Sequence, residues 1–166
     1  MTISTFALQQ KNAKHLIQSF SDLSYINNPE ETNIISRADG VYIYDNDGKK
    51  ILDSMSGLWC VNMGYGQQSI IKAVNEQMKE LVYYNNFFGS SHPSAIKLSE
   101  MIADKTPEGM NKVYFCGSGS EANDTVVRLA RHYWAAKGKP SKSVIISRTN
   151  AYHGSTMAGA SLGGMS

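Results

Sequence analysis

The chain has 166 residues, of which 42% are apolar and 18% are charged, and its net charge is +2. A balance this close to neutral gives no electrostatic reason to expect nucleic acid or an anionic membrane surface as a partner. No apolar run approaches the length of a membrane span, and polar residues 9–12 interrupt any secretory leader.

The first predicted element is an amphipathic helix over residues 5–23. Its apolar stripe consists of Ala13, Leu16, Ile17, Phe20 and Leu23. The sequence at 27–29, which ends in Pro29, breaks this helix, and a polar stretch with Glu30 and Glu31 follows.

A β-hairpin comes next, with strands over residues 41–44 and 49–53. The intervening residues 45–48, Asp-Asn-Asp-Gly, have the composition of a tight turn. Residues 54–66 are rich in glycine and aromatic side chains without a regular period. We expect this backbone to bend tightly around Trp59, whose simplest role is that of a core tryptophan.

Two further helices are predicted, one over residues 67–82 and one that starts at 91–93 and stops at 106–109. Serine at the start of the second can cap it, and its apolar face consists of Ala95, Leu98 and Ile102. Between the two helices, residues 83–89 place four aromatic side chains around two asparagines. This composition favours a loop packed against a partner or a ligand.

The remainder reads as strand, turn, helix and strand. Residues 112–116 predict a buried strand, and a helix begins near Ser120 and ends at 137–140. Residues 144–146 predict a second buried strand, parallel to the first through a βαβ crossover.

Residues 117–120, Gly-Ser-Gly-Ser, join the first of these strands to the helix and form a candidate phosphate cup. Glycine lets the backbone approach an anion, and the first N–H groups of the helix and the serine hydroxyls supply donors. Gly-Ser turns also serve purely structural purposes, so the cup alone leaves both readings open. The neighbouring Glu121 disfavours a triphosphate and favours a single phosphate on a small cofactor.

Three better-known phosphate or nucleophile motifs do not match this turn. A P-loop needs a lysine after its last glycine, where this chain has Ser120. The dinucleotide fingerprint needs a third glycine in place of Ala122. A nucleophile elbow, Gly-x-Ser-x-Gly, fails because its fifth position is Glu121.

Tyr152 and His153 follow the second predicted strand. Ligands of open parallel sheets lie beyond the carboxyl ends of the strands, so we expect these residues on the same side as the cup. A flat aromatic side chain there can stack on a heteroaromatic ring whose phosphate occupies the cup. A simple capped turn is the alternative for the sequence Tyr-His-Gly at 152–154.

The two cysteines, Cys60 and Cys116, lie in apolar settings and lack the spacing of metal ligands. We therefore expect no metal site and a reduced, cytoplasmic chain, with a disulfide left open.

Taken together, residues 115–124 and 150–156 resemble the class III aminotransferases of fold type I, which use pyridoxal 5′-phosphate. Residues 39–45, 53–59 and 87–93 are similar to the ω-amino acid:pyruvate branch of that family in particular. The resemblance extends over essentially the whole chain in the order of the family.

The resemblance implies roles for individual residues. Gly119 and Ser120 would donate to the cofactor phosphate beside Ser118, and Tyr152 would stack on the pyridine ring with His153 near it. Glu121 would hold the pocket by hydrogen bonds or favour the helix N-terminus. The substrate pocket would be lined by Trp59, Phe87 and Phe88, the phenylalanines reaching the neighbouring subunit of a homodimer.

The family's chemistry also needs a lysine that forms a Schiff base with the cofactor and an aspartate that pairs with the pyridine nitrogen. Neither has a counterpart here, so no catalytic residue is assigned. Lys137, Lys139 and Lys142 read as solvated charges. We therefore expect an N-terminal fragment of a longer enzyme, inactive on its own.

The fold implied is an incomplete α/β, fold type I transferase. Residues 1–60 would belong to a small domain and residues 61–166 to the first part of the large parallel-sheet domain. The parent enzyme would move an amino group from an ω-amino acid or amine to an α-keto acid such as pyruvate. A short non-catalytic interaction module and another pyridoxal-phosphate reaction, such as that of an aminomutase, are the alternatives.

Overall fold

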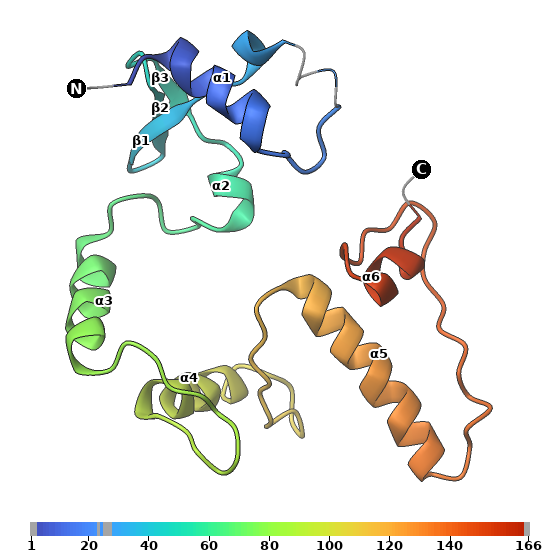
Figure 1. Ribbon diagram of the computed structural model, residues 1–166. Helices are drawn as coiled ribbons and strands as arrows, with labels where there is room; N and C mark the ends of the chain where they lie inside the picture. The colour runs from blue at the N-terminus through green and yellow to red at the C-terminus, as the bar shows by residue number, and fades with distance from the viewer. Residues whose placement is uncertain (1–2, 23, 25–27, 165–166) are drawn as a thin grey trace. The chain divides into compact units, whose positions relative to one another are not determined.

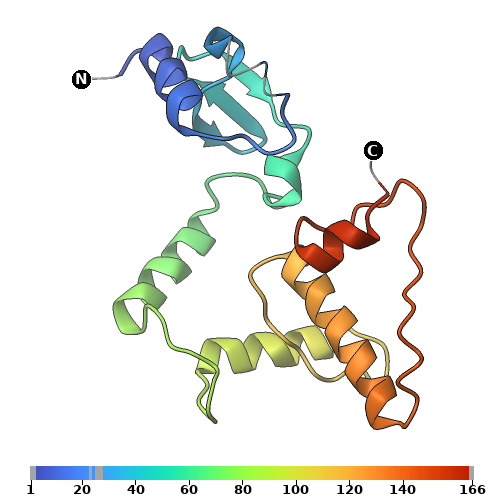
Figure 2. The same ribbon diagram turned by 45° about the vertical axis from the view of Figure 1, so that its right-hand side comes forward.

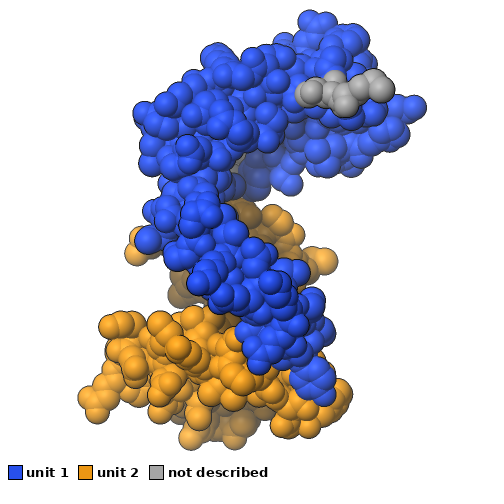
Figure 3. Space-filling model, turned by 90° about the vertical axis from the view of Figure 1, so that its left-hand side faces the viewer, with its two compact units in different colours: residues 1–84 blue, residues 85–166 orange. Residues whose placement is uncertain are grey.

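The computed structural model describes residues 3–22, 24 and 28–164. The chain forms two compact units, residues 1–84 and 85–166 (Figure 3). The boundary expected after residue 60 concerns the domains of a complete enzyme and stays a prediction.

The first unit contains a three-stranded antiparallel sheet (Figure 1) in the order β1 (Ile35–Asp39), β2 (Tyr42–Asp45) and β3 (Lys50–Leu52). The β2–β3 hairpin confirms the predicted one. Its turn is held by Asp45, whose Oδ1 accepts the backbone N–H of Lys49 at 2.8 Å.

The sequence does not predict β1, because its residues Ile-Ser-Arg-Ala-Asp lack an apolar alternation. Side chains of β1 and β2 also contact each other across the pairing, since the guanidinium of Arg37 lies 3.6 Å from the ring centroid of Tyr44. A cation–π pair of this kind needs the partner strand in place before it contributes.

Helix α1 (Thr5–His15) lies beside this sheet in both ribbon views (Figures 1 and 2). It ends earlier than the predicted residue 23, which itself lies outside the described residues. Ile17 and Phe20, expected on its apolar stripe, are 82% and 77% exposed, so little of their apolar surface is buried. A polar contact fixes α1 instead: buried Gln9 donates to the carbonyl oxygens of Glu30 and Thr32, both at 3.0 Å.

The 3₁₀ turn η2 (Pro29–Glu31) supplies one of these carbonyls. After the sheet come α2 (Ser56–Trp59), where the backbone is not that of an ordinary helix, and α3 (Gln68–Glu80). The latter confirms the helix predicted over residues 67–82.

The second unit contains α4 (Pro93–Ala103), α5 (Gly119–Ala136) and α6 (Met157–Leu162). The first two confirm predicted helices. The cap of α4 differs from the prediction, because Nδ1 of His92 accepts the N–H of Ala95, at 3.4 Å, in place of a serine hydroxyl.

Both strands predicted for this unit are wrong for the described chain. Residues 112–116 and 144–146 have no strand partner, and the parallel crossover between them does not form. A strand exists only when a neighbouring strand satisfies its N–H and C=O groups, and these two segments do not form backbone hydrogen bonds with each other. Val144 and Ile146 are accordingly exposed.

None of the described hydrophobic side chains is buried. The expected burial of Leu98 and Ile102 on α4 is therefore wrong here, and Ala95 is only half-buried. Helix formation in this chain consequently rests on caps and local hydrogen bonds more than on a shared core.

Candidate functional site

The predicted cup, residues 117–120, lies at the N-terminus of α5. Ser118 is the N-cap residue, and its Oγ accepts the N–H of Glu121 at 3.2 Å. The Glu121 carboxylate in turn accepts the N–H of Gly117 at 2.7 Å. These two bonds resemble a capping box displaced by one residue, in which Ser118 caps α5 and Glu121 holds the cup closed through Gly117.

The cup keeps hydrogen-bond donors available. Among the described residues, the N–H groups of Gly119 and Ser120 have no acceptor. The oxygens of Ser118 and Ser120 each accept a backbone N–H, which leaves each hydroxyl proton to donate elsewhere. Four donors at the N-terminus of an 18-residue helix form an arrangement that favours an anion.

The loop at residues 152–156 lies directly against this cup. The N–H of Ser155 donates to Oγ of Ser120 at 3.0 Å, across 35 residues of sequence. The hydroxyl of Thr156 also lies 3.3 Å from the carbonyl oxygen of Ser120. The structure thus brings together the two loops that the sequence expects to share one ligand.

Gly154 makes this close approach possible. Its φ is +122°, and a Cβ built there would lie 2.5 Å from Oγ and 2.8 Å from Cα of Ser120. Only glycine combines that backbone conformation with the absence of a side chain. The tight contact between the loops therefore depends on this position.

Tyr152 and His153 occupy the same loop. The Tyr152 hydroxyl lies 3.2 Å from Oγ of Ser155, and the side chain is 56% exposed. Nε2 of His153 is buried and finds no hydrogen-bond partner among the described residues. A buried nitrogen without a partner is uncommon in folded proteins, so this atom is suited to a partner from outside the described chain.

Trp59 lies in a left-handed turn of the first unit. Ser56, Gly57, Leu58 and Trp59 have φ values of 50°, 58°, 62° and 66°. Each non-glycine residue in this region costs about 1–2 kcal/mol. A run of such residues needs strong local hydrogen bonds, and strain of this kind is concentrated at functional sites.

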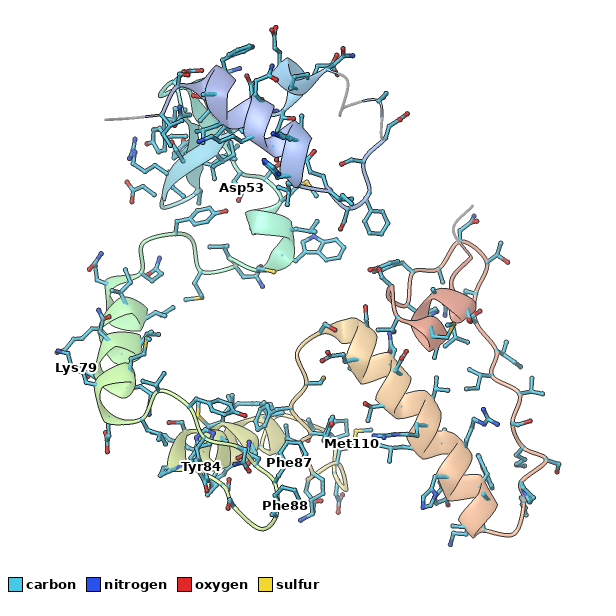
Figure 4. All side chains as sticks on the ribbon, in the orientation of Figure 1. Asp53, Lys79, Tyr84, Phe87, Phe88 and Met110 are labelled. Atoms are coloured by element: carbon cyan, nitrogen blue, oxygen red, sulfur yellow. The ribbon has the colours of Figure 1, made fainter. Side chains whose placement is uncertain are left out.

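Asp53, which is labelled in Figure 4, supplies hydrogen bonds to this turn. Its Oδ2 accepts the N–H of Gly57 at 2.7 Å and the hydroxyl of Tyr65 at 2.8 Å, and its Oδ1 accepts the N–H of Met55 at 3.2 Å. The hydrogen bond from Tyr65 lowers the pKa of Asp53, and the same bond raises the pKa of Tyr65. The carboxylate thus braces the turn that presents Trp59.

Phe87 and Phe88 lie in the loop that precedes α4 (Figure 4), with ring centroids 6.0 Å apart. Phe88 has a φ of 55° and is fully exposed. No described hydrogen bond or ring contact joins either residue to the cup. Their role in a substrate pocket therefore stays a prediction.

A hollow of about 570 Å³ borders the cup between residues 114–116 and α5. Glu121 and Asp124 line it together with Arg128. Two carboxylates disfavour a phosphate there, so the hydroxyl-lined side of the cup remains the candidate anion site.

Within the part of the chain that the structure describes, no group of three or more His, Cys, Asp and Glu side chains could hold a metal ion. No helix there is both long enough and apolar enough to cross a membrane.

Sequence reasoning missed the supporting residues Asn123, Asp124, Asp53 and Tyr65. For two of them a signal exists, since Ser120, Asn123 and Asp124 stand at positions i, i+3 and i+4 and so share one face of α5. The link between Asp53 and Tyr65 has no such local signal.

Comparisons with known proteins agree with this geometry. The model of the family described as aminotransferase class-III matches residues 25–166. The putrescine–pyruvate aminotransferase of Pseudomonas aeruginosa is 55% identical over 157 residues, which are 95% of this chain and 34% of that protein.

Solved structures give the same result. A transaminase from the marine bacterium Virgibacillus matches with a TM-score of 0.90 and 41% identity, over 95% of this chain and 36% of that one. An (S)-enantioselective ω-transaminase from Thermomicrobium roseum matches with a TM-score of 0.91 and 33% identity, over 99% of this chain and 36% of that one. The chain thus spans about a third of the length of these relatives and has the fold of that part of them.

We predict that Gly154→Ala separates the two loops of the site. The added Cβ overlaps Ser120, and relieving the overlap by moving the backbone costs on the order of 1–3 kcal/mol. Amide hydrogen exchange at Ser155, whose N–H bonds Ser120, should accelerate about tenfold or more. Gly109→Ala is the matched control, because its φ is +87° but no atom lies within 4 Å of the added Cβ. Equal exchange at Ser155 in the two variants would contradict the assignment.

We predict that Tyr65→Phe raises the pKa of Asp53 toward its ordinary value of 3.8, because the largest cause of the lowering is removed. Because the pKa of Asp53 is lower in the folded chain than in the unfolded chain, the ionised carboxylate stabilises the turn at pH values above the unfolded pKa. This stabilisation is lost as the pH falls through the folded pKa. The variant should lose the turn at a higher pH than the parent chain during acid titration. Carboxyl ¹³C NMR measures the pKa directly. Tyr42→Phe serves as the control, and an unchanged Asp53 titration in Tyr65→Phe would refute the brace.

Proposed function

Because the chain belongs to the class III aminotransferases, we propose that the complete protein transfers an amino group from an ω-amino acid or amine to an α-keto acid. Pyruvate is the proposed acceptor. A relative 55% identical over 157 residues is a putrescine–pyruvate aminotransferase, which makes a terminal diamine the first donor to test.

We assign pyridoxal 5′-phosphate as the cofactor. The observation that supports it is the hydrogen bond between the N–H of Ser155 and Oγ of Ser120, which joins an anion-binding helix N-terminus to a loop carrying an aromatic ring. The amides of Gly119 and Ser120 and the hydroxyls of Ser118 and Ser120 would hold the phosphate. Tyr152 would stack on the ring. The residues present therefore fit the group.

When bound, pyridoxal phosphate supplies an aldehyde that takes up the amino group and a ring that withdraws electrons from the reacting carbon. The residues of this chain would bind and orient it. Glu121 keeps the cup in shape through Gly117, and its negative charge limits the site to a single phosphate. His153, with its unpaired buried Nε2, would give that nitrogen to a group bound beside the loop.

On the substrate side, we propose that Trp59, Phe87 and Phe88 line the pocket. The strained turn that presents Trp59 and the exposed, left-handed Phe88 both support this, because exposed aromatic side chains on constrained backbone are typical of contact surfaces. We further propose a homodimer in which the loop with Phe87 and Phe88 reaches the partner, and a reducing, cytoplasmic setting in which Cys60 and Cys116 stay free thiols.

We predict that the full-length protein, supplied with pyridoxal phosphate, consumes putrescine and forms alanine from pyruvate in equal amounts. Amino-acid analysis of the product measures the reaction, and size-exclusion chromatography with light scattering measures the dimer. A protein that takes up the cofactor but shifts an amino group within one substrate would be an aminomutase. A protein that binds neither cofactor nor amine would be an interaction module, and the proposed function would be wrong.

We predict that Ser120→Ala in the full-length protein weakens pyridoxal phosphate binding about tenfold or more, because a hydrogen bond to a charged phosphate contributes roughly 1.5–3 kcal/mol. Binding of pyridoxal, which lacks the phosphate, should change much less. Equilibrium dialysis gives both dissociation constants. Ser99→Ala removes a matched hydroxyl, which bonds the carbonyl of Ile96 within α4, and should leave both unchanged. An equal loss for pyridoxal would contradict the phosphate role of Ser120.

A further inference from the structure

One polar face of α5 contacts the loop that carries the proposed ring-stacking tyrosine. Ser120, Asn123 and Asp124 lie at i, i+3 and i+4 of this helix, and each forms a hydrogen bond to a group in residues 153–159. Ser120 belongs to the phosphate cup itself. Asn123 and Asp124 lie one turn further along and have no part in the cup, so their bonds hold the loop and the start of α6.

Asn123 fixes the loop at the residue next to Tyr152. Its side-chain amide donates to the carbonyl oxygen of His153 at 2.7 Å, in a partly buried position. The same carbonyl lies 2.8 Å from the place where a Cβ of Gly159 would stand, so α6 approaches it closely from another side. The peptide that follows His153 is thus held between α5 and α6.

Asp124 caps α6 from a different helix. Its Oδ1 accepts the hydroxyl of Thr156 at 2.6 Å and the backbone N–H of Gly159 at 3.1 Å. Thr156 is the N-cap residue of α6 by position, yet its side chain makes no cap hydrogen bond to its own helix. The carboxylate of Asp124 therefore performs this task, which ties the far end of the loop to α5.

We propose that Asn123 and Asp124 are positioning residues that set the separation between the phosphate cup and the ring-stacking side chain. This inference rests on the proposed function. Neither residue needs to touch the cofactor, because both act through residues 152–156, which they anchor at His153 and Thr156. A ligand that must engage the cup and the ring together binds only when both are in register, whereas a ligand of the cup alone does not require the loop.

The test uses the full-length protein and two probes, pyridoxal phosphate and inorganic phosphate. In Asn123→Ala and Asp124→Ala we expect the dissociation constant for pyridoxal phosphate to rise roughly tenfold or more, because the competent arrangement of the loop becomes a minor population. The constant for inorganic phosphate, measured by competition or by NMR titration of the Ser120 amide, should stay within about twofold. Ser120→Ala should weaken both.

Two further variants separate positioning from general destabilisation. Asp124→Asn keeps an oxygen acceptor at the same place and should bind pyridoxal phosphate within about threefold of the parent. Asp104→Ala removes an exposed carboxylate near the end of α4 and should change neither constant. If Asp124→Ala does not fold, Asn123→Ala, which loses the bond to His153, still provides the comparison.

A parallel loss of pyridoxal phosphate and inorganic phosphate in Asn123→Ala would overturn the inference, and so would unchanged affinity for pyridoxal phosphate. A loss in Asp124→Asn as large as in Asp124→Ala would also overturn it. These outcomes differ from a failure of the proposed function, in which the unmodified full-length protein itself would bind inorganic phosphate but not pyridoxal phosphate. The inference would then fall with it.

Discussion

The hydrogen bond from the N–H of Ser155 to Oγ of Ser120 is the contact on which the site depends, because it joins two loops 35 residues apart. It can form only because Gly154 has no side chain, which lets the backbone at residue 154 approach Ser120 more closely than a residue with a Cβ could. The bond also sets the direction of the Ser120 hydroxyl, whose oxygen accepts on one side and whose proton remains for an anion. One local contact thus determines where the loop meets the cup.

The parts of this site that the sequence predicts are those with a local cause. The helix start near Ser120 and the acidic Glu121 at its N-terminus were predicted, and in the structure Ser118 caps α5 through the N–H of Glu121 while the Glu121 carboxylate accepts the N–H of Gly117. The hairpin turn at Asp45 and the helices α3, α4 and α5 were predictable for the same reason, since caps, turn residues and helical periodicity act within a few residues.

The parts that failed depend on partners distant in sequence. Residues 112–116 and 144–146 have the composition of buried strands, but a strand needs hydrogen-bonded neighbours, and no described residue pairs with either segment. β1 shows the converse, because its polar sequence becomes a strand by antiparallel pairing with β2, across which Arg37 contacts Tyr44. The tight bend expected around Trp59 is present as a left-handed turn, but its brace was not predictable, since Asp53 and Tyr65 are twelve residues apart without a periodic pattern.

Helix α5 has two faces with different functions, one polar and one apolar. Ser120, Asn123 and Asp124 occupy one face and satisfy the loop, while Val126, Leu129 and Tyr133 present an apolar face that is more than half exposed here. Hydrogen bonds are directional and short-ranged, so they can fix the loop without a surrounding core. Burial of the apolar face, in contrast, requires another part of a protein to pack against it. The site geometry is therefore encoded within the described residues, whereas its rigidity and desolvation depend on what packs against the opposite face of α5.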